Sequence, residues 1–203
     1  MYGGVSAEDR RAERRAKLIE AGLELVSRDG WTGVTIRAVC GEAGLTERYF
    51  YESFADREAL LLAVFDRVAA EAAVGVVAAV DAAPHDAFEK ARAAVGAFVE
   101  MLTEDPRRAR AMLVESMTTP ALRERRAETI HQFAALMSER GREFLGEKAM
   151  SEQDSELTSI ALVGGLAELV VAWLEGRLDV SRERLVEHYA ALFVAASTVT
   201  SEP

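Results

Sequence analysis

The sequence predicts an all-α protein, and three observations support this fold class. Strand patterns are almost absent, because β-branched runs are few and no stretch of useful length alternates between apolar and polar residues. Residues that typically start or stop helices recur at intervals of about 10 to 25 residues, the usual length range of globular helices. Apolar residues between these points repeat with helical spacing. We therefore expect about nine helices, arranged as a small three-helix head followed by a larger helical body.

The head is predicted over residues 1–57, with helices at about residues 7–28, 36–43 and 46–53. Glycine commonly follows the last residue of a helix, so the first helix is expected to stop at Asp29-Gly30 and the second at Gly44. Thr35 and Thr46 are expected to be the N-caps of the second and third helices. The second and third helices of the head are therefore expected to be short and separated by a tight turn.

The body is predicted over residues 58–203. Its expected helices span about residues 56–79, 86–104, 106–116, 120–146, 151–176 and 181–197, and the first of these joins the head to the body. Two helices are expected to begin in the same way, with a capping residue followed by a proline at the first helical position. These starts are at Asp105-Pro106 and Thr119-Pro120. No internal repeat or low-complexity segment interrupts the pattern.

The charge balance differs between the two parts. The chain has 24 Lys and Arg residues against 34 Asp and Glu residues, a net charge of −10, which taken as a whole argues against a polyanionic partner. Residues 1–57, however, hold nine basic and ten acidic side chains, so nearly all of the excess negative charge follows Arg57. A phosphate-rich partner would therefore bind to the head.

Several features point to a soluble cytoplasmic protein. The single cysteine, Cys40, has no second thiol for a disulfide or a zinc site, which fits a reducing compartment. The N-terminus reaches charged residues before any apolar run, unlike a signal peptide. The longest apolar stretch, 160–174, is shorter than a membrane-spanning helix and contains Glu168. We expect no membrane association.

Residues 35–57 have the spacing of a helix-turn-helix, in which the second helix lies in the major groove of DNA. Phe50 and Phe54, four residues apart, share one face of that helix and are expected to pack against the first helix of the head. The residues off this face are Thr46, Glu47, Arg48, Tyr49 and Tyr51. Hydroxyl groups bind phosphates, arginine pairs with phosphate or guanine, and a glutamate can accept a hydrogen bond from cytosine N4.

The segment TIRAVCGEAGLTERYFYESFADREALL, within residues 15–62, resembles the DNA-binding head of the TetR family of bacterial transcriptional regulators. The resemblance implies that Arg37, Glu47, Arg48 and Tyr49 read bases and that Thr35, Thr46, Tyr51 and Arg57 hold phosphates. The chain departs from the family pattern at Glu47, Arg48 and Ala55, and these positions bear on the operator sequence. The arginines of residues 10–15 are either further phosphate contacts or a solvated helix face.

The body resembles the C-terminal domains of the same family more loosely, through the segment EDPRRARAMLVESMTTPALRERR. The resemblance implies a homodimer that binds a pseudo-palindromic operator in double-stranded DNA as a repressor and is released by an unknown small-molecule effector. The last two helices would form the dimer interface. Apolar and small residues there that suit close helix packing are Leu162, Gly164, Gly165, Leu169, Leu185, Tyr189, Leu192 and Phe193.

Two features of the body are open to more than one interpretation. The residues Phe98, Met101, Met112, Met117, Phe133, Met137 and Trp173 either line an adaptable apolar effector pocket or belong to an ordinary core. Glu168, alone in its apolar run, is either a hydrogen-bonded interface residue or a pocket acid that would favour a cationic effector.

The sequence contains no pattern typical of catalysis. The three histidines are scattered without metal-ligand spacing, and there is no nucleophile and base pair, glycine-rich phosphate loop or HExxH motif. We therefore expect no metal, no cofactor and no enzymatic activity. The main alternative to a repressor is a helical ligand-binding or scaffold protein whose head has lost specific DNA binding, an interpretation that Glu47 and the net charge of −10 support.

Overall fold

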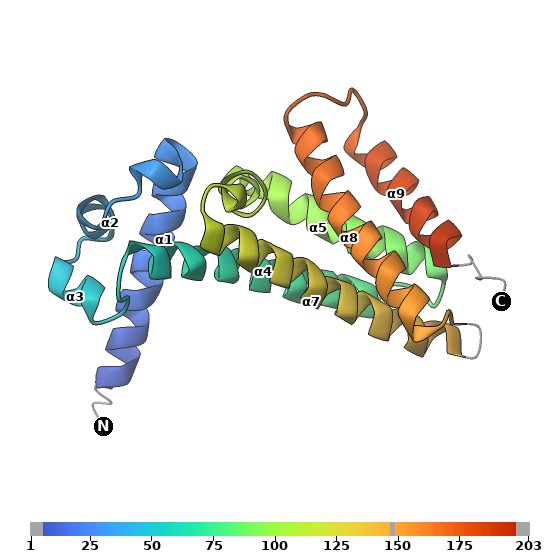
Figure 1. Ribbon diagram of the computed structural model, residues 1–203, viewed down its shortest axis with the longest axis horizontal. Coiled ribbons are helices and arrows are strands. Elements are labelled where there is room, and N and C mark those ends of the chain that lie inside the picture. Colours follow the sequence, from blue (N-terminus) through green and yellow to red (C-terminus); the bar gives the residue numbers. More distant parts are fainter. Residues whose placement is uncertain (1–5, 147–148, 198–203) are drawn as a thin grey trace. The chain divides into compact units, whose positions relative to one another are not determined.

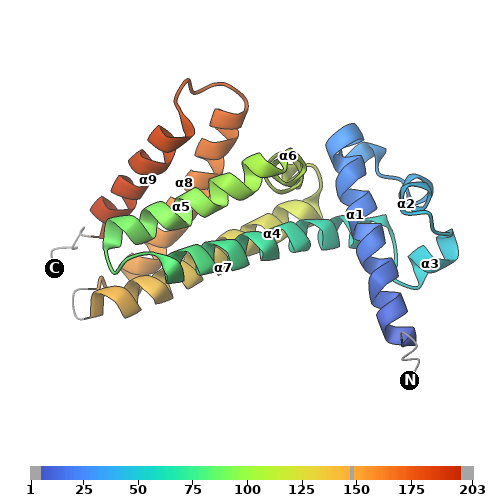
Figure 2. The ribbon, with the colours of Figure 1, turned by 180° about the vertical axis from the view of Figure 1, so that it is seen from behind.

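The structure is a computed structural model that describes residues 6–146 and 149–197 (Figures 1 and 2). In these residues it has nine α-helices and no strand, which confirms the predicted fold class. The helices are α1 (Ala7–Gly33), α2 (Ile36–Ala43), α3 (Glu47–Tyr51), α4 (Arg57–Ala82), α5 (Ala87–Glu104), α6 (Pro106–Ala109), α7 (Pro120–Leu145), α8 (Glu152–Leu174) and α9 (Arg182–Ser197).

The chain forms two compact units. The first, which we call the head unit, contains the described residues up to Ala69 together with Asp105–Arg125. The second, the body unit, contains Ala70–Glu104 and the described residues from Arg126 onward. The predicted head, residues 1–57, is thus one part of a larger unit that also includes the first turns of α4 and the segment around α6.

Local capping explains where most helices begin. The Ser6 hydroxyl accepts the Asp9 N–H at 3.0 Å, and the Asp9 carboxylate accepts the Ser6 N–H at 3.1 Å, so the two residues close a capping box before α1. Asp105 caps α6 with Pro106 at the first helical position, as predicted. Thr35 caps α2, whereas the side chain of Thr46 makes no capping bond to α3 and its hydroxyl is left for other partners.

The first helix is broken at Gly30, where the sequence predicts its end, but the chain then continues in a further helical turn that the sequence does not predict. Gly30 has φ 69° and ψ 176°, which breaks the helical path, and one more helical turn follows to Gly33. The break leaves backbone groups without helical partners, and distant side chains satisfy them. Arg110 Nη1 donates to the Ser27 carbonyl at 2.7 Å, and the Trp31 N–H donates to Glu115 Oε2 at 3.2 Å.

The helix predicted at residues 106–116 is also different, because α6 gives way to a π-helical turn at Arg110–Val114 and a 3₁₀ turn at Glu115–Met117. In an α-helix, side chains five residues apart would point about 140° away from each other. The wider π-helical turn brings them to one side. Arg110 Nε and Glu115 Oε1 lie 3.3 Å apart, and both side chains reach the break in α1.

The core of the head unit confirms the predicted packing of aromatic and aliphatic residues. Leu18, Val26 and Phe50 are fully buried, and Trp31 is 1% exposed. Phe54 lies beside Phe50, with ring centroids 5.7 Å apart. Apolar burial of this extent is the main favourable contribution to the folding of such a small unit.

A cluster of charged side chains joins α1 to α6 and to Asp105, the residue before α6. Arg107 Nη1 lies 2.9 Å from Glu20 Oε1 and 3.1 Å from Glu24 Oε2, and Arg107 Nη2 lies 2.7 Å from Asp105 Oδ2. Hydrogen bonding to Arg107 holds the pKa of Asp105 below its ordinary value. Partial burial acts to raise the pKa of Glu20, but the hydrogen bonds and charges of Arg67 and Arg107 outweigh it and leave that pKa lowered.

These lowered pKa values predict an acid-sensitive head unit. A carboxyl group whose pKa is lower in the folded state stabilises the fold above its unfolded pKa, and this contribution is lost as the pH falls through the folded pKa. Thermal unfolding followed by circular dichroism should therefore show a loss of stability below about pH 4. In an Arg107→Met variant the loss should be shallower, because acid then also relieves repulsion among Glu20, Glu24 and Asp105. An unchanged slope would contradict this account.

In the body unit, α5 packs against α9, and α8 and α9 lie side by side in both ribbon views (Figures 1 and 2). The Tyr189 side chain is 4% exposed, and its hydroxyl donates to the Leu162 carbonyl of α8. Burial raises the pKa of Tyr189 to about 12. A Cβ atom added at Gly165 would lie 3.0 Å from the Tyr189 hydroxyl, so a small residue is required there.

Among the described residues, α8 is the one helix long and apolar enough to cross a membrane by length and composition.

Candidate nucleic-acid interface

Helices α2 and α3 form the predicted helix-turn-helix and lie on the same side of α1 in both ribbon views (Figures 1 and 2). Gly44 makes the turn between them with φ 64°, a left-handed conformation that a glycine adopts without strain. The Leu45 N–H donates to the Cys40 carbonyl at 2.9 Å and closes the end of α2. A single left-handed residue therefore sets the angle at which α3 leaves α2.

The side chains of α3 divide between the core and the surface as the sequence predicts. Phe50 is fully buried, while Tyr51 is 58% exposed even though its ring meets the Phe50 ring edge-on at 5.5 Å. Tyr49 is 37% exposed. Glu47 and Arg48 are also exposed. The outer surface of α3 thus presents a carboxylate, a guanidinium and two phenol groups, which is a set able to hydrogen-bond both phosphates and base edges.

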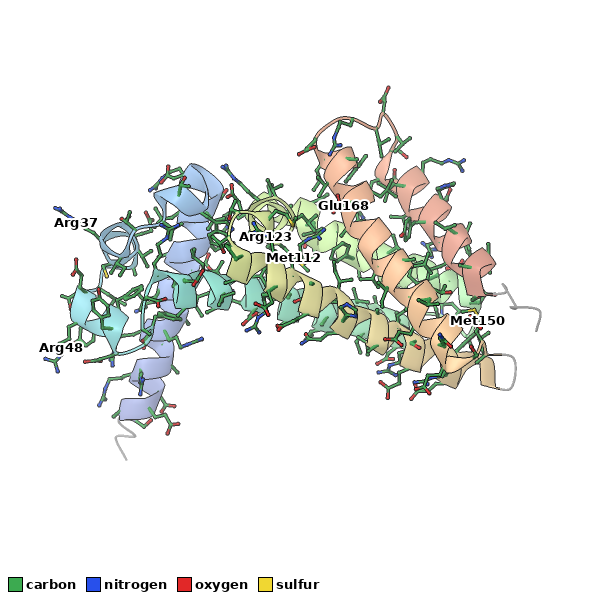
Figure 3. All side chains as sticks on the ribbon, in the orientation of Figure 1. Arg37, Arg48, Met112, Arg123, Met150 and Glu168 are labelled. Carbon is green, nitrogen blue, oxygen red and sulfur yellow. The ribbon has the colours of Figure 1, made fainter. Side chains whose placement is uncertain are left out.

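The structure places all but one of the predicted DNA-contacting residues on the exposed surface of residues 35–51. Arg37 of α2 and Arg48 of α3 both project away from α1 (Figure 3). Thr35 and Thr46 are exposed at the starts of α2 and α3. Arg57 is the exception, because it is half-buried and its Nη2 donates to the Trp31 carbonyl. The phosphate contact predicted for Arg57 would need Nη1, because Nε is buried.

Sequence reasoning missed the contribution of Glu52, the residue that follows α3. Its carboxylate lies 3.2 Å from Arg48 Nε and 3.4 Å from Arg14 Nη2, and its carbonyl accepts a hydrogen bond from Arg11. The Arg14 guanidinium also lies over the Tyr49 ring, 4.6 Å from its centroid. The spacing of Arg48 and Glu52, four residues apart on one helix face, is visible in the sequence, but the approach of α1 to α3 is a tertiary contact.

The predicted effector residues fall in both units. Phe98, Met101, Phe133, Met137 and Trp173 are half-buried in the body unit, whereas Met112 is buried and Met117 is 50% exposed in the head unit. The Trp173 Nε1 donates to the Val180 carbonyl at 2.9 Å, so its polar edge is satisfied within the chain. Whether the five residues of the body unit line an effector site stays a prediction.

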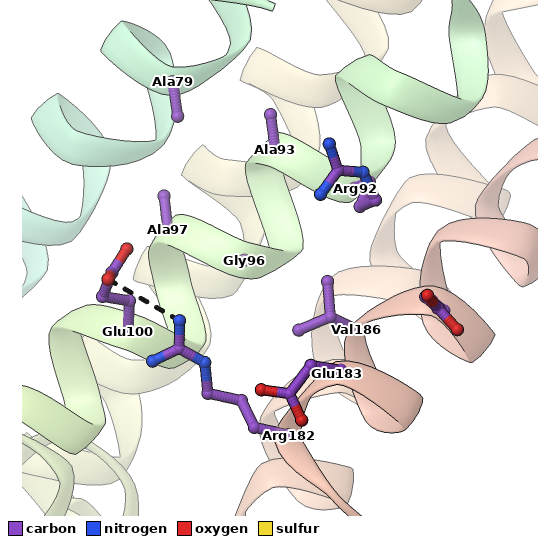
Figure 4. Close-up of a pocket in the computed structure, with 10 residues that line it drawn as sticks. Ala79, Arg92, Ala93, Gly96, Ala97, Glu100, Arg182, Glu183 and Val186 are labelled. Carbon is purple, nitrogen blue, oxygen red and sulfur yellow. Dashed lines mark ion pairs between the residues drawn. The ribbon is translucent and has the colours of Figure 1, made fainter.

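A groove of about 350 Å³ lies in the body unit, and none of these residues lines it (Figure 4). Its walls come from α4, α5 and α9 and consist of Ala79, Arg92, Ala93, Gly96, Ala97, Glu100, Arg182, Glu183, Val186 and Glu187. Arg182 Nη2 lies 3.6 Å from Glu100 Oε1, so two of the charges in the groove neutralise each other.

The predicted dimer residues differ in how much surface they offer to a second chain. Leu162, Leu185 and Tyr189 are 7%, 3% and 4% exposed, so the body unit already covers them within the chain. Gly165 and Leu192 are exposed, and the rest of the set, Gly164, Leu169 and Phe193, is half-buried. Any contact between two chains would therefore use mainly this second group.

Glu168 lies on the surface of α8. Its side chain is 70% exposed, and Oε1 accepts a hydrogen bond from Arg126 Nη2 of α7 at 2.6 Å. This position removes the main reason for interpreting Glu168 as a buried pocket acid.

Comparisons with known proteins agree with this geometry. Residues 18–64 match the model of the bacterial regulatory proteins of the tetR family, and no curated protein matches the chain. The fatty acid degradation regulator FadR of Bacillus halodurans is 19% identical over 89% of this chain and 94% of its own, with a TM-score of 0.76.

Two further solved structures cover nearly the whole chain. The transcriptional regulator FadR of Bacillus subtilis, in complex with stearoyl-CoA, is 17% identical over 89% of this chain and 98% of its own, with a TM-score of 0.75. A TetR family transcription regulator of Marinobacter aquaeolei VT8 is 19% identical over 93% of this chain and 97% of its own, with a TM-score of 0.67. These structures share the fold. The chain is thus similar to the tetR family of bacterial regulatory proteins over residues 18–64, and it shares the fold of these solved regulators.

Proposed function

We propose that the chain is a cytoplasmic, homodimeric repressor that binds a pseudo-palindromic DNA operator and is released by a small-molecule effector. The observation that carries the proposal is the division of α3, where Phe50 is fully buried and the side chains around it are exposed. A helix anchored by its aromatic residues and polar on its outer surface suits insertion into the major groove. The head can then read base edges without losing its core.

A dimer would present two such helices to one face of DNA. The half-sites of a palindromic operator lie about 34 to 36 Å apart, so the two heads must be held at a fixed separation. Leu157 of α8 is 63% exposed and Leu192 of α9 is 45% exposed, although both helices are rich in apolar residues. A two-fold contact through α8 and α9 would cover this apolar surface in both chains.

The effector is proposed to be a molecule with a long apolar part. The predicted effector residues of the body unit are aromatic or methionine side chains, which adapt to apolar ligands of varied shape. The fold neighbour from Bacillus subtilis was solved in complex with stearoyl-CoA. Both observations favour an acyl chain over a compact polar effector. Helix α4 begins beside the helix-turn-helix and extends to Ala82, so a shift of its far end would change the separation of the heads.

The proposal is tested by following oligomeric state and DNA binding together. Sedimentation equilibrium should give a dimer for the natural chain and a monomer for Leu192→Glu, and the variant should bind an operator fragment much more weakly in a mobility-shift titration. Val74→Glu, at a residue of α4 that is 71% exposed, is the matched control and should remain dimeric.

Stearoyl-CoA added to the natural complex should release the DNA. A monomeric natural chain would disprove the dimer. An operator affinity unaffected by acyl-CoA, free fatty acids or unrelated apolar compounds would disprove release by such an effector.

A further inference from the structure

Glu52 is a carboxylate at the end of the helix proposed to read DNA, where negative charge repels the phosphate backbone. Its side chain is 35% exposed. One carboxylate oxygen faces Arg48 Nε at 3.2 Å, and the other faces Arg14 Nη2 at 3.4 Å. Glu52 thus adds a charge that repels DNA in general, yet its carboxylate contacts two arginines of the proposed interface.

The contact with Arg48 uses only one edge of the guanidinium. Glu52 accepts from Nε, and the Arg48 side chain is 85% exposed. The pair therefore leaves Nη1 and Nη2 to a partner outside the protein. Two parallel N–H donors are what the O6 and N7 atoms of guanine accept in the major groove, and this is the commonest specific contact of arginine with a base.

The carboxylate is itself held in place, unlike most surface ion pairs. Arg14 is 24% exposed, and its guanidinium lies over the Tyr49 ring as well as beside Glu52. Arg11 donates to the Glu52 carbonyl, which fixes the backbone at the end of α3. The orientation of Arg48 thus follows from a chain of contacts that begins on α1.

We propose that Glu52 is a positioning residue that holds Arg48 so that its outer edge reads one guanine in each half-site. This inference rests on the proposed function, since it assumes that α3 enters the major groove. It assigns the specific contact to Arg48 and a supporting function to Glu52 and Arg14. A preoriented arginine loses less side-chain freedom on binding, which favours the guanine it faces over the other bases.

The test compares base preference, because a purely structural loss would weaken all sequences alike. The best site obtained with the natural chain is titrated by fluorescence anisotropy, and then each guanine in turn is replaced by 7-deazaguanine, which lacks the N7 acceptor. One symmetric pair of replacements should weaken binding by less than the about 5- to 150-fold per contact that a complete bidentate arginine and guanine pair is worth, because O6 still accepts one hydrogen bond. Arg48→Ala should abolish this preference.

Glu52→Ala should reduce the same preference and leave the preference at other positions unchanged. In the Arg48→Ala background it should have no further effect at that position. Glu42→Ala is the matched control, because Glu42 is 37% exposed and pairs with Arg28 at 3.4 Å on another part of the head. It should not change the preference. If Glu52→Ala fails to fold by circular dichroism, Glu52→Gln, which keeps a weaker neutral acceptor, should give an intermediate loss.

Two results would overturn the inference. In the first, Glu52→Ala raises affinity equally for all sequences, which would show that Glu52 only neutralises the arginines. In the second, Arg48→Ala keeps the response to 7-deazaguanine. Failure of the proposed function is seen separately, because the natural chain would then select no DNA at all.

Discussion

Replacing Phe50 with alanine is expected to lower the free energy of unfolding of the head unit by about 3 to 5 kcal/mol, the usual cost of truncating a buried phenylalanine. Phe50 is fully buried, and its ring contacts those of Tyr51 and Phe54. The void would lie between α3 and the rest of the head unit, so α3 would lose its anchor. Because natural domains are only marginally stable, DNA binding should be lost with it.

Denaturation by urea, followed by circular dichroism and by fluorescence, measures this effect. Tyr51→Ala is the matched control, because Tyr51 is on the same helix but is 58% exposed. It should change stability by less than about 1 kcal/mol and still weaken DNA binding. If Phe50→Ala were as stable as Tyr51→Ala, the aromatic anchor would not hold α3 in place.

Replacing Gly30 with alanine is expected to cost about 2 to 4 kcal/mol through two effects on the break in α1. The backbone at Gly30 has φ 69° and ψ 176°, a region that other residues hardly enter. An added Cβ would also lie 3.0 Å from Glu115 Oε1. Glu115 would have to move away from the Trp31 N–H, leaving that buried donor without its acceptor.

The same urea denaturation tests this effect, and Gly41→Ala is its control. Gly41 lies inside α2, and an added Cβ there would meet nothing within 4 Å. Alanine should therefore raise stability by about 0.5 to 1 kcal/mol, because it loses less backbone freedom than glycine in a helix. If Gly30→Ala and Gly41→Ala were equally stable, a side chain at position 30 would not strain the break in α1.

The parts of the fold that the sequence predicts are those determined by local contacts. Asp105 with Pro106 starts a helix because both effects act within one turn. The course of α1 past Gly30 depends instead on Arg110 and Glu115, which lie 83 and 84 positions along the chain from their partners Ser27 and Trp31. No local pattern around Gly30 shows that these side chains satisfy the broken backbone.

The same distinction holds at the candidate site. Helical spacing alone separates Phe50 from the exposed Arg48, because the two lie on opposite sides of one helix. It does not show that Arg57 is directed to the Trp31 carbonyl, or that Arg14 lies over Tyr49. Each of these contacts joins elements whose approach only the folded chain defines.

Selection of bound DNA from a random pool with the purified chain tests directly whether it recognises a specific operator as a dimer. We expect enrichment of a pseudo-palindrome whose half-sites are centred about 34 to 36 Å apart and each contain a guanine read by Arg48. Enrichment of no sequence, with binding that depends on salt alone, would contradict this expectation and would favour a helical ligand-binding or scaffold protein whose head no longer recognises DNA.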